Sequence, residues 1–178
     1  MPRLFAGLEI PQHAALSLSM MRGGLPGARW IDPENYHITL RFIGDIDDRL
    51  AHEIDWLFDQ VKRRPFEVRF GALSTFGGRK PRAIIVTIDP VPQLVELQAE
   101  LERLMQRVGL EPEGRKFTPH VTLARLRESS SQQVAEYLSS RGPVFVTPFR
   151  VSRFVLFSSK ASVGGGPYVV EATYPLAA

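Results

Sequence analysis

A four-residue motif that occurs twice constrains this chain more than any other feature of its sequence. Residues 37–40 read HITL and residues 120–123 read HVTL, and each copy lies in a stretch with a strand-like pattern. Because alternate side chains of a strand share a face, the histidine and threonine of each copy face one way and the two apolar residues the other. Composition alone would produce two such copies roughly once in 10⁴ chains, so we interpret the repetition as functional rather than as core strands with satisfied histidines.

The composition is that of an ordinary globular protein. Of the 178 residues, 44% are apolar and 23% are charged, and we expect a single domain over residues 1–178. The absence of cysteine excludes disulfides, thiol catalysis and cysteine-ligated metals. We find neither a signal peptide nor an apolar segment of membrane-spanning length, and therefore expect a cytoplasmic protein without a membrane partner. The net charge of +3 suits a polyanionic ligand.

Apolar periodicity and breaker residues predict the same order of elements twice. In the first half we expect strands over residues 3–10, 36–43 and 66–70, a helix over about 11–22, and a second helix that begins near residue 47 and stops at Pro65. In the second half we expect strands over 83–88, 120–126, 144–151, 153–157 and 168–174. We also expect a helix between Pro92 and Gly109 and a shorter helix capped by one of the serines at 129–131. Glycine-rich loops are predicted at 75–81 and 164–167.

The two halves therefore form an internal repeat of about 83 residues, the distance between the motif histidines. Residues 65–68 (PFEV) also match residues 148–151 (PFRV). We predict an α+β fold of two pseudo-symmetric lobes, at about 1–80 and 81–178, each with a mainly antiparallel sheet and two helices on its outer face. The motif strands would then meet across a central cleft, which is a common place for a ligand site.

Two histidines that face each other across a cleft are suited to acid–base chemistry on a phosphodiester. An imidazole titrates near pH ~6.5, so one can take a proton from attacking water while the other gives a proton to the leaving oxygen. In-line displacement places these events on opposite sides of phosphorus. Thr39 and Thr122 could donate hydrogen bonds to the phosphate oxygens. No metal or cofactor is needed for this chemistry, and symmetry alone does not decide which histidine is the acid.

Two arginines follow the motifs and are candidates for substrate binding. Arg41 continues the alternation of the first motif, so we expect it on the same face as His37 and Thr39. Arg125 is out of phase with His120 unless the strand ends or bulges there. The other interpretation of both arginines is a solvated strand edge.

Other residues and other chemistries fit less well. The remaining histidines, His13 and His52, lie on predicted helices and are expected at the surface. Loop cations at positions 79, 80, 115, 116 and 160 are expected to be scattered and solvated, and the other interpretation is that they line a basic groove. A two-histidine metal site needs further ligands, and the acidic residues at 32, 34 and 45 do not have metal-binding spacing. No phosphate-binding glycine loop and no serine-hydrolase elbow are present.

The motifs and their surroundings resemble the two-histidine phosphoesterases. The closest resemblance is to their bacterial and archaeal branch, the RNA 2′,3′-cyclic phosphodiesterases, formerly named 2′-5′ RNA ligases. It rests on residues 3–6, 29–30, 33–44, 117–125 and 174–176, and so covers nearly the whole chain. No motif position departs from the family pattern.

This resemblance implies metal-free hydrolysis of RNA 2′,3′-cyclic phosphate ends to 2′-phosphomonoesters. It also implies a weak reverse reaction, the 2′-5′ ligation of RNA. By motif position, His37 would be the proton donor and His120 the proton acceptor. Thr39 and Thr122 would bind the phosphate. The expected partner is RNA with a cyclic phosphate end, such as a tRNA fragment. We expect the protein to be a monomer. Two alternatives stay open: a non-catalytic module that binds RNA ends, and a phosphoesterase for small cyclic nucleotides or 2′-5′ oligoadenylate.

Overall fold

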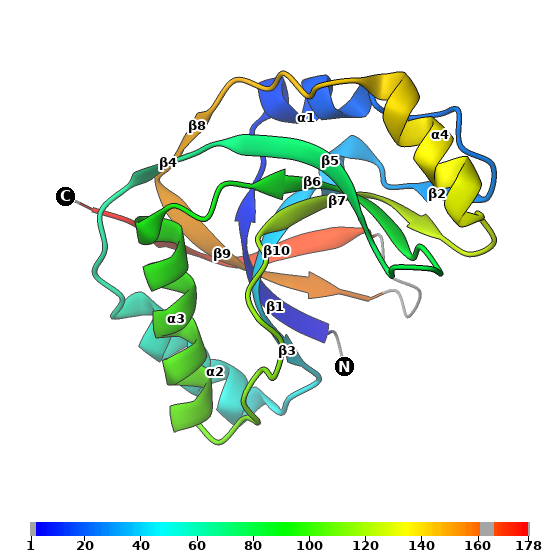
Figure 1. Cartoon of the computed structure of the whole chain (residues 1–178). Coiled ribbons are helices and arrows are strands. Elements are labelled where there is room, and N and C mark those ends of the chain that lie inside the picture. The colour runs from blue at the N-terminus through cyan, green and yellow to red at the C-terminus, as the bar shows by residue number, and fades with distance from the viewer. Residues whose placement is uncertain (1–2, 161–165, 178) are drawn as a thin grey trace.

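The computed structural model describes residues 3–160 and 166–177 and has an α+β fold built on a mainly antiparallel sheet (Figure 1). The strand order in this sheet is β10-β9-β1-β3-β7-β6-β5, and a short strand β2 also pairs with β7. The motif strands β3 and β7 lie in the middle of this order. Strands β4 and β8 form a separate two-stranded sheet. The strands are β1 (Arg3–Glu9), β2 (Ala28–Trp30), β3 (His37–Gly44), β4 (Phe66–Val68), β5 (Phe70–Phe76), β6 (Ala83–Ile88), β7 (His120–Leu126), β8 (Phe149–Val151), β9 (Arg153–Ser159) and β10 (Tyr168–Pro175).

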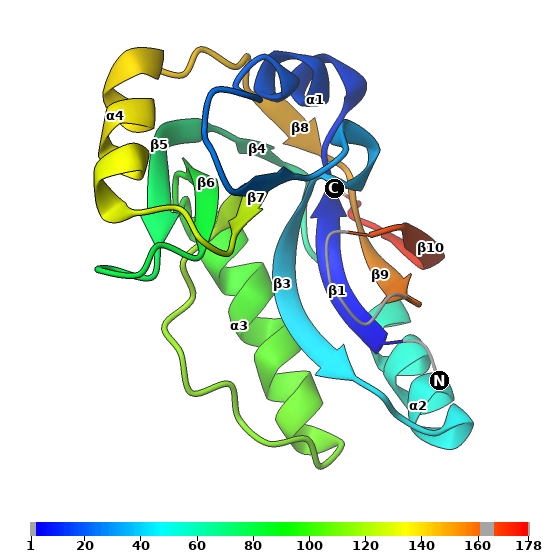
Figure 2. The same ribbon diagram turned by 90° about the vertical axis from the view of Figure 1, so that its right-hand side faces the viewer.

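In the described part of the chain, four α-helices cover the sheet in two pairs (Figures 1 and 2). They are α1 (Gln12–Ser19), α2 (Asp48–Asp59), α3 (Pro92–Arg107) and α4 (Ser131–Arg141). Their ends follow from local chemistry. The Asp47 side chain accepts a hydrogen bond from the Leu50 amide at the start of α2, and Ser130 forms a capping box with Gln133 at the start of α4. Gly109, with φ of 100°, follows the end of α3.

The observed elements differ from the predicted ones in three places. Strand β2 was not predicted, and β5 continues to Phe76 through the start of the expected loop. Only Phe149–Val151 of the predicted strand at 144–151 is a strand, because it pairs with β4 while the residues before it have no such partner in the described chain. Residues 164 and 165 of the predicted glycine loop lie outside the described residues.

The sequence repeat does not divide the sheet at residue 80, which corrects the predicted lobes at 1–80 and 81–178. Strand β5, the last strand of the first repeat, pairs with β6 of the second. Strand β9, its counterpart in the second repeat, pairs with β1 of the first. The helices are exchanged as well: α2 packs on α3, and the Tyr137 hydroxyl of α4 donates to the Met21 carbonyl just after α1. Each half of the sheet therefore contains elements from both repeats.

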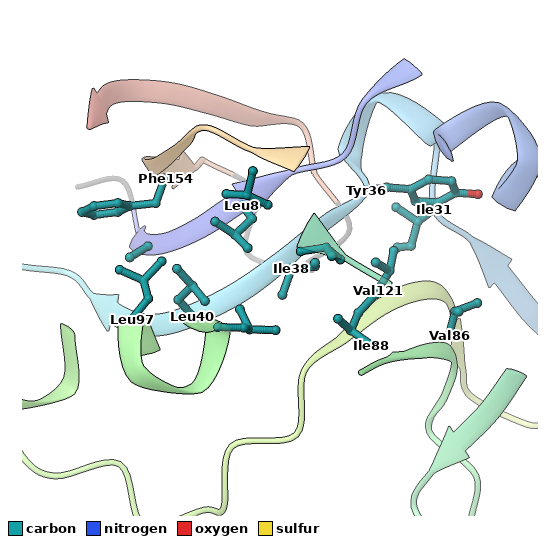
Figure 3. Close-up of a cluster of buried hydrophobic side chains, with 14 of the residues drawn as sticks. Leu8, Ile31, Tyr36, Ile38, Leu40, Val86, Ile88, Leu97, Val121 and Phe154 are labelled. Atoms are coloured by element: carbon teal, nitrogen blue, oxygen red, sulfur yellow. The ribbon is translucent and has the colours of Figure 1, made fainter. Parts of the chain in front are cut away.

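The apolar residues of the two motifs anchor the motif strands in the core. Ile38, Leu40, Val121 and Leu123 are all between 0 and 3% exposed. Figure 3 shows Ile38, Leu40 and Val121 among other core side chains, including Leu97 from α3. Because these residues point into the core, the histidine and threonine of each motif point to the opposite face of the sheet.

Candidate active site

The two motifs meet where β3 and β7 pair at the centre of the sheet. Ile38 lies opposite Val121 in antiparallel register. Continued by one residue in each direction, this register places His37 opposite Thr122 and Thr39 opposite His120. The four polar side chains therefore form a square on one face of the sheet, as the sequence predicted. They line a cavity of about 300 Å³ together with Arg82, Arg115, Arg125 and Tyr168, among others.

The two imidazoles are held in the same way. His37 Nδ1 lies 2.9 Å from the carbonyl of Asn35, and His120 Nδ1 lies 2.7 Å from the carbonyl of Thr118, in each case two residues earlier in the chain. A carbonyl can only accept, so each Nδ1 carries the hydrogen and each Nε2 has a lone pair. The Thr39 hydroxyl donates to His37 Nε2 over 3.0 Å. The backbone thus fixes the orientation of both imidazole rings.

Burial favours the neutral form of both histidines in the free protein. Burial lowers the pKa of His37 to about 4; the bond to Asn35 opposes this, and the charges of His120 and Arg125 add to it. Burial and Arg125 also lower the pKa of His120, against the hydrogen bond to Thr118. A charge on either imidazole disfavours a charge on the other, so the two histidines titrate as a coupled pair.

Aromatic rings enclose the imidazoles and account for this burial. The His37 ring lies 4.9 Å from Phe5 and 4.8 Å from Tyr168, measured between ring centroids. The His120 ring meets Phe76 edge-on at 4.6 Å. The backbone of Tyr168 is also held in place, because its amide donates a hydrogen bond to the Asn35 side chain over 3.2 Å. The rings exclude water from the imidazoles and restrict their rotation.

A bulge in each motif strand decides which of the two arginines reaches the cavity. The register of β3 against β1 shifts between Arg41 and Thr39, and the register of β7 against β6 shifts at the matching position, so alternation breaks after each motif leucine. Arg41 therefore leaves the His37 face: it is 7% exposed and its guanidinium binds Glu102 of α3. Arg125, which simple alternation places out of phase, returns to the cavity. Phe42 occupies the position on β3 that Arg125 occupies on β7.

Several cavity residues were not singled out from the sequence. Arg82 lies where the tight turn after Phe76 returns to β6, and its amide donates to the Phe76 carbonyl over 2.7 Å. Arg115 was expected among scattered loop cations, yet it lines the cavity. Asn35 could have been found by its position two residues before the motif histidine. His13 and His52 are exposed and outside the cavity, as predicted.

Within residues 3–160 and 166–177, no three histidine, aspartate or glutamate side chains gather as a metal site would require. In the same part of the chain, every helix is too short or too polar to cross a bilayer.

Comparison with known proteins identifies the family. Residues 14–162 match the 2′-5′ RNA ligase superfamily. The chain belongs to this superfamily. It is 30% identical over 152 residues to the RNA 2′,3′-cyclic phosphodiesterase of Aquifex aeolicus, covering 82% of this chain and 81% of that protein. It is 32% identical over 149 residues to the protein of the same name from Aeropyrum pernix, covering 82% and 84%. Among solved structures, E. coli LigT complexed with 3′-AMP has the same fold, with a TM-score of 0.83 at 23% identity and 99% of both chains covered.

Proposed function

We propose that this member of the superfamily hydrolyses RNA 2′,3′-cyclic phosphate ends to 2′-phosphomonoesters. The observation that carries the proposal is the pair of backbone-fixed imidazoles, His37 and His120, that line one cavity with the Arg125 side chain. Relatives about 30% identical over four-fifths of the chain are named for this activity. The cavity is large enough for a phosphate and an attacking water.

In the proposed mechanism the two histidines act on opposite sides of phosphorus. His120 Nε2 takes a proton from water as its oxygen bonds to phosphorus, and His37 Nε2 gives a proton to the 3′ oxygen as the P–O3′ bond breaks. The product keeps the phosphate on the 2′ oxygen, and the two histidines exchange protonation states. Thr39 and Thr122 donate hydrogen bonds to the non-bridging oxygens, and the charge of Arg125 stabilises the negative charge that develops there.

The proton that His37 needs is stabilised by the substrate itself. In the free site the pKa of His37 is about 4, so its imidazole is neutral at neutral pH. A bound phosphodiester places a negative charge beside the imidazole, and an opposite charge at this distance raises a pKa. The acid therefore becomes competent only when a phosphate is bound. The assignment of donor and acceptor rests on the motif resemblance.

The finer parts of the proposal concern substrate and setting. We infer that tRNA fragments with cyclic phosphate ends are among the substrates, and that the chain acts as a monomer in the cytoplasm. A non-catalytic RNA-end module and a phosphoesterase for small cyclic nucleotides or 2′-5′ oligoadenylate are the competing functions, and the same assay distinguishes them.

The test is product identification by phosphorus NMR. The protein is incubated, with EDTA present, with a short RNA that ends in a 2′,3′-cyclic phosphate. A 2′-phosphomonoester is expected. A 3′-phosphomonoester would exchange the roles of His37 and His120. An RNA that binds tightly but stays intact would indicate the binding module, and turnover of cyclic mononucleotides or 2′-5′ oligoadenylate with a higher kcat/KM would indicate the related phosphoesterase.

A further inference from the structure

Two further hollows share lining residues with the cavity that holds both motif histidines, which we call the catalytic cavity. The smaller, of about 200 Å³, is lined by residues that include His37, Phe5 and Tyr168. The larger, of about 380 Å³, reaches His120 but not His37. Phe42, which is 48% exposed, lines both hollows. The bulge in β3 therefore places an aromatic ring between two spaces that each open toward the reacting phosphate.

The larger hollow combines aromatic and cationic side chains. Phe42, Phe76 and Phe117 line it, and so do the cations Arg82, Arg115 and Lys116 and the carboxylate of Glu113. All three cations are exposed. Arg41 lines it as well, but its guanidinium is bound to Glu102. Flat apolar rings beside unburied positive charges are the features that single-stranded nucleic acid binds, because bases stack on the rings and phosphates pair with the cations.

The walls of this hollow are fixed by contacts that its lining residues make with neighbouring segments. On one side, Gly77 has φ of 110°, and a side chain there would collide with the Lys80 carbonyl, so the turn that carries Arg82 requires glycine. On the other side, Arg41 Nη2 donates to the Glu111 carbonyl over 2.6 Å, and the Glu113 amide donates to Glu102 over 3.3 Å. The hollow is therefore preformed rather than shaped by its ligand.

We propose that the larger hollow is a subsite for the second nucleotide of the RNA, the one next to the nucleoside that carries the cyclic phosphate. The inference rests on the proposed function and specifies its substrate as an oligonucleotide. The terminal base occupies the smaller hollow beside His37, on the leaving-group side. The neighbouring base lies on the other side of Phe42, against Phe117. Arg82 and Arg115 line both the catalytic cavity and this hollow, and they bind the phosphodiester that joins the two nucleotides.

The test compares adenosine 2′,3′-cyclic phosphate with the dinucleotide ApA that ends in the same cyclic phosphate. Stacking of one base contributes about 5- to 150-fold, so the wild-type kcat/KM for the dinucleotide should exceed that for the mononucleotide by about tenfold or more. Phe117→Ala should reduce this ratio to near one and leave mononucleotide hydrolysis within about twofold. Arg115→Gln should also lower the ratio. Phe145→Ala, which removes an 83% exposed phenylalanine outside the hollow, should change neither value.

The outcomes separate this inference from the proposed function. A wild-type ratio near one, or a Phe117→Ala variant that loses activity equally on both substrates, would overturn the subsite while the hydrolysis stands. If neither substrate is hydrolysed, the proposed function fails, and titration calorimetry with adenosine 2′-phosphate and ApA 2′-phosphate still tests the hollow. Tighter binding of the dinucleotide that Phe117→Ala abolishes would support the subsite, and equal dissociation constants would refute it.

Discussion

The buried ion pair between Arg41 and Glu102 gives the sharpest test of how the structure assigns the two motif arginines. The Arg41 guanidinium donates to both carboxylate oxygens of Glu102, at 2.6 and 3.4 Å, and to the carbonyls of Phe42 at 2.5 Å and Glu111 at 2.6 Å. The arginine is 7% exposed and the carboxylate 16%. We predict that Arg41→Met destabilises the fold, because it leaves a buried carboxylate without its cation.

The size of the effect follows from what remains around the carboxylate. Removing one partner of a buried ion pair costs about 3 to 5 kcal/mol. Glu102 keeps the hydrogen bonds from Gln106 and from the Glu113 amide, so we expect the lower end, about 3 kcal/mol. With a urea m-value of about 2 kcal/mol/M, the unfolding midpoint should fall by roughly 1.5 M. The double variant Arg41→Met with Glu102→Leu removes both charges and should lie within about 1 kcal/mol of wild type.

The assay is urea unfolding at pH 7 and again in acid, with Arg103→Met on the exposed side of α3 as the control. Burial raises the pKa of Glu102, but hydrogen bonds from Arg41, Gln106 and Glu113 outweigh it, so the pKa lies below its usual 4.5. The contribution of the pair is therefore present above pH 4.5 and lost as the pH falls through the folded-state pKa, and the Arg41→Met deficit should shrink in acid. A midpoint change below about 0.3 M, or a double variant as unstable as the single one, would refute the reasoning.

Three further predictions concern the catalytic cavity. His37→Ala and His120→Ala should each lower kcat by about 10²- to 10⁴-fold or more while the circular dichroism spectrum and unfolding midpoint stay close to wild type; full activity in either variant would contradict the paired mechanism. Because the pKa of both histidines is lowered, the bell-shaped pH profile of kcat/KM should have its maximum below pH 6.5. The charge of Arg125 lowers both pKa values, so Arg125→Gln should move both limbs of the profile to higher pH, and the control Arg127→Gln should not. Prolonged dialysis against EDTA should leave kcat unchanged, and a loss that Zn²⁺ or Mn²⁺ restores would indicate a metal mechanism.

The sequence predicted what depends on local pattern and missed what depends on register. Alternation in the motif strands correctly placed the histidines and threonines on one face, because the buried partners Ile38 and Val121 fix the strand faces. The same alternation placed Arg41 on the wrong face, and it brought Arg125 to the histidine face only if the strand ended or bulged, because one extra residue in each strand reverses the faces beyond it. A bulge forms between strands, and the sequence of one strand carries no signal for it.

The exchange of strands between repeats was also beyond local pattern. The elements of each repeat were largely recognisable, but whether β5 returns to its own repeat or joins β6 is decided by long-range pairing. The matching segments at 65–68 and 148–151 suggested symmetry, and the structure pairs them with each other as β4 and β8. Cavity residues such as Arg82 come together only through these tertiary connections.

That exchange has a consequence for how such a site can arise. A chain of half this length, with the same elements, could satisfy the edge of its sheet only by interlocking with a second copy, as in a domain-swapped homodimer. In that dimer the two histidines would be chemically identical, and neither could be dedicated to one proton transfer. Joining the halves in one polypeptide frees them to diverge. Here Phe42 faces the cleft on one motif strand where Arg125 does on the other. A covalent link between the halves thus permits the two motif strands to carry different side chains at matching positions.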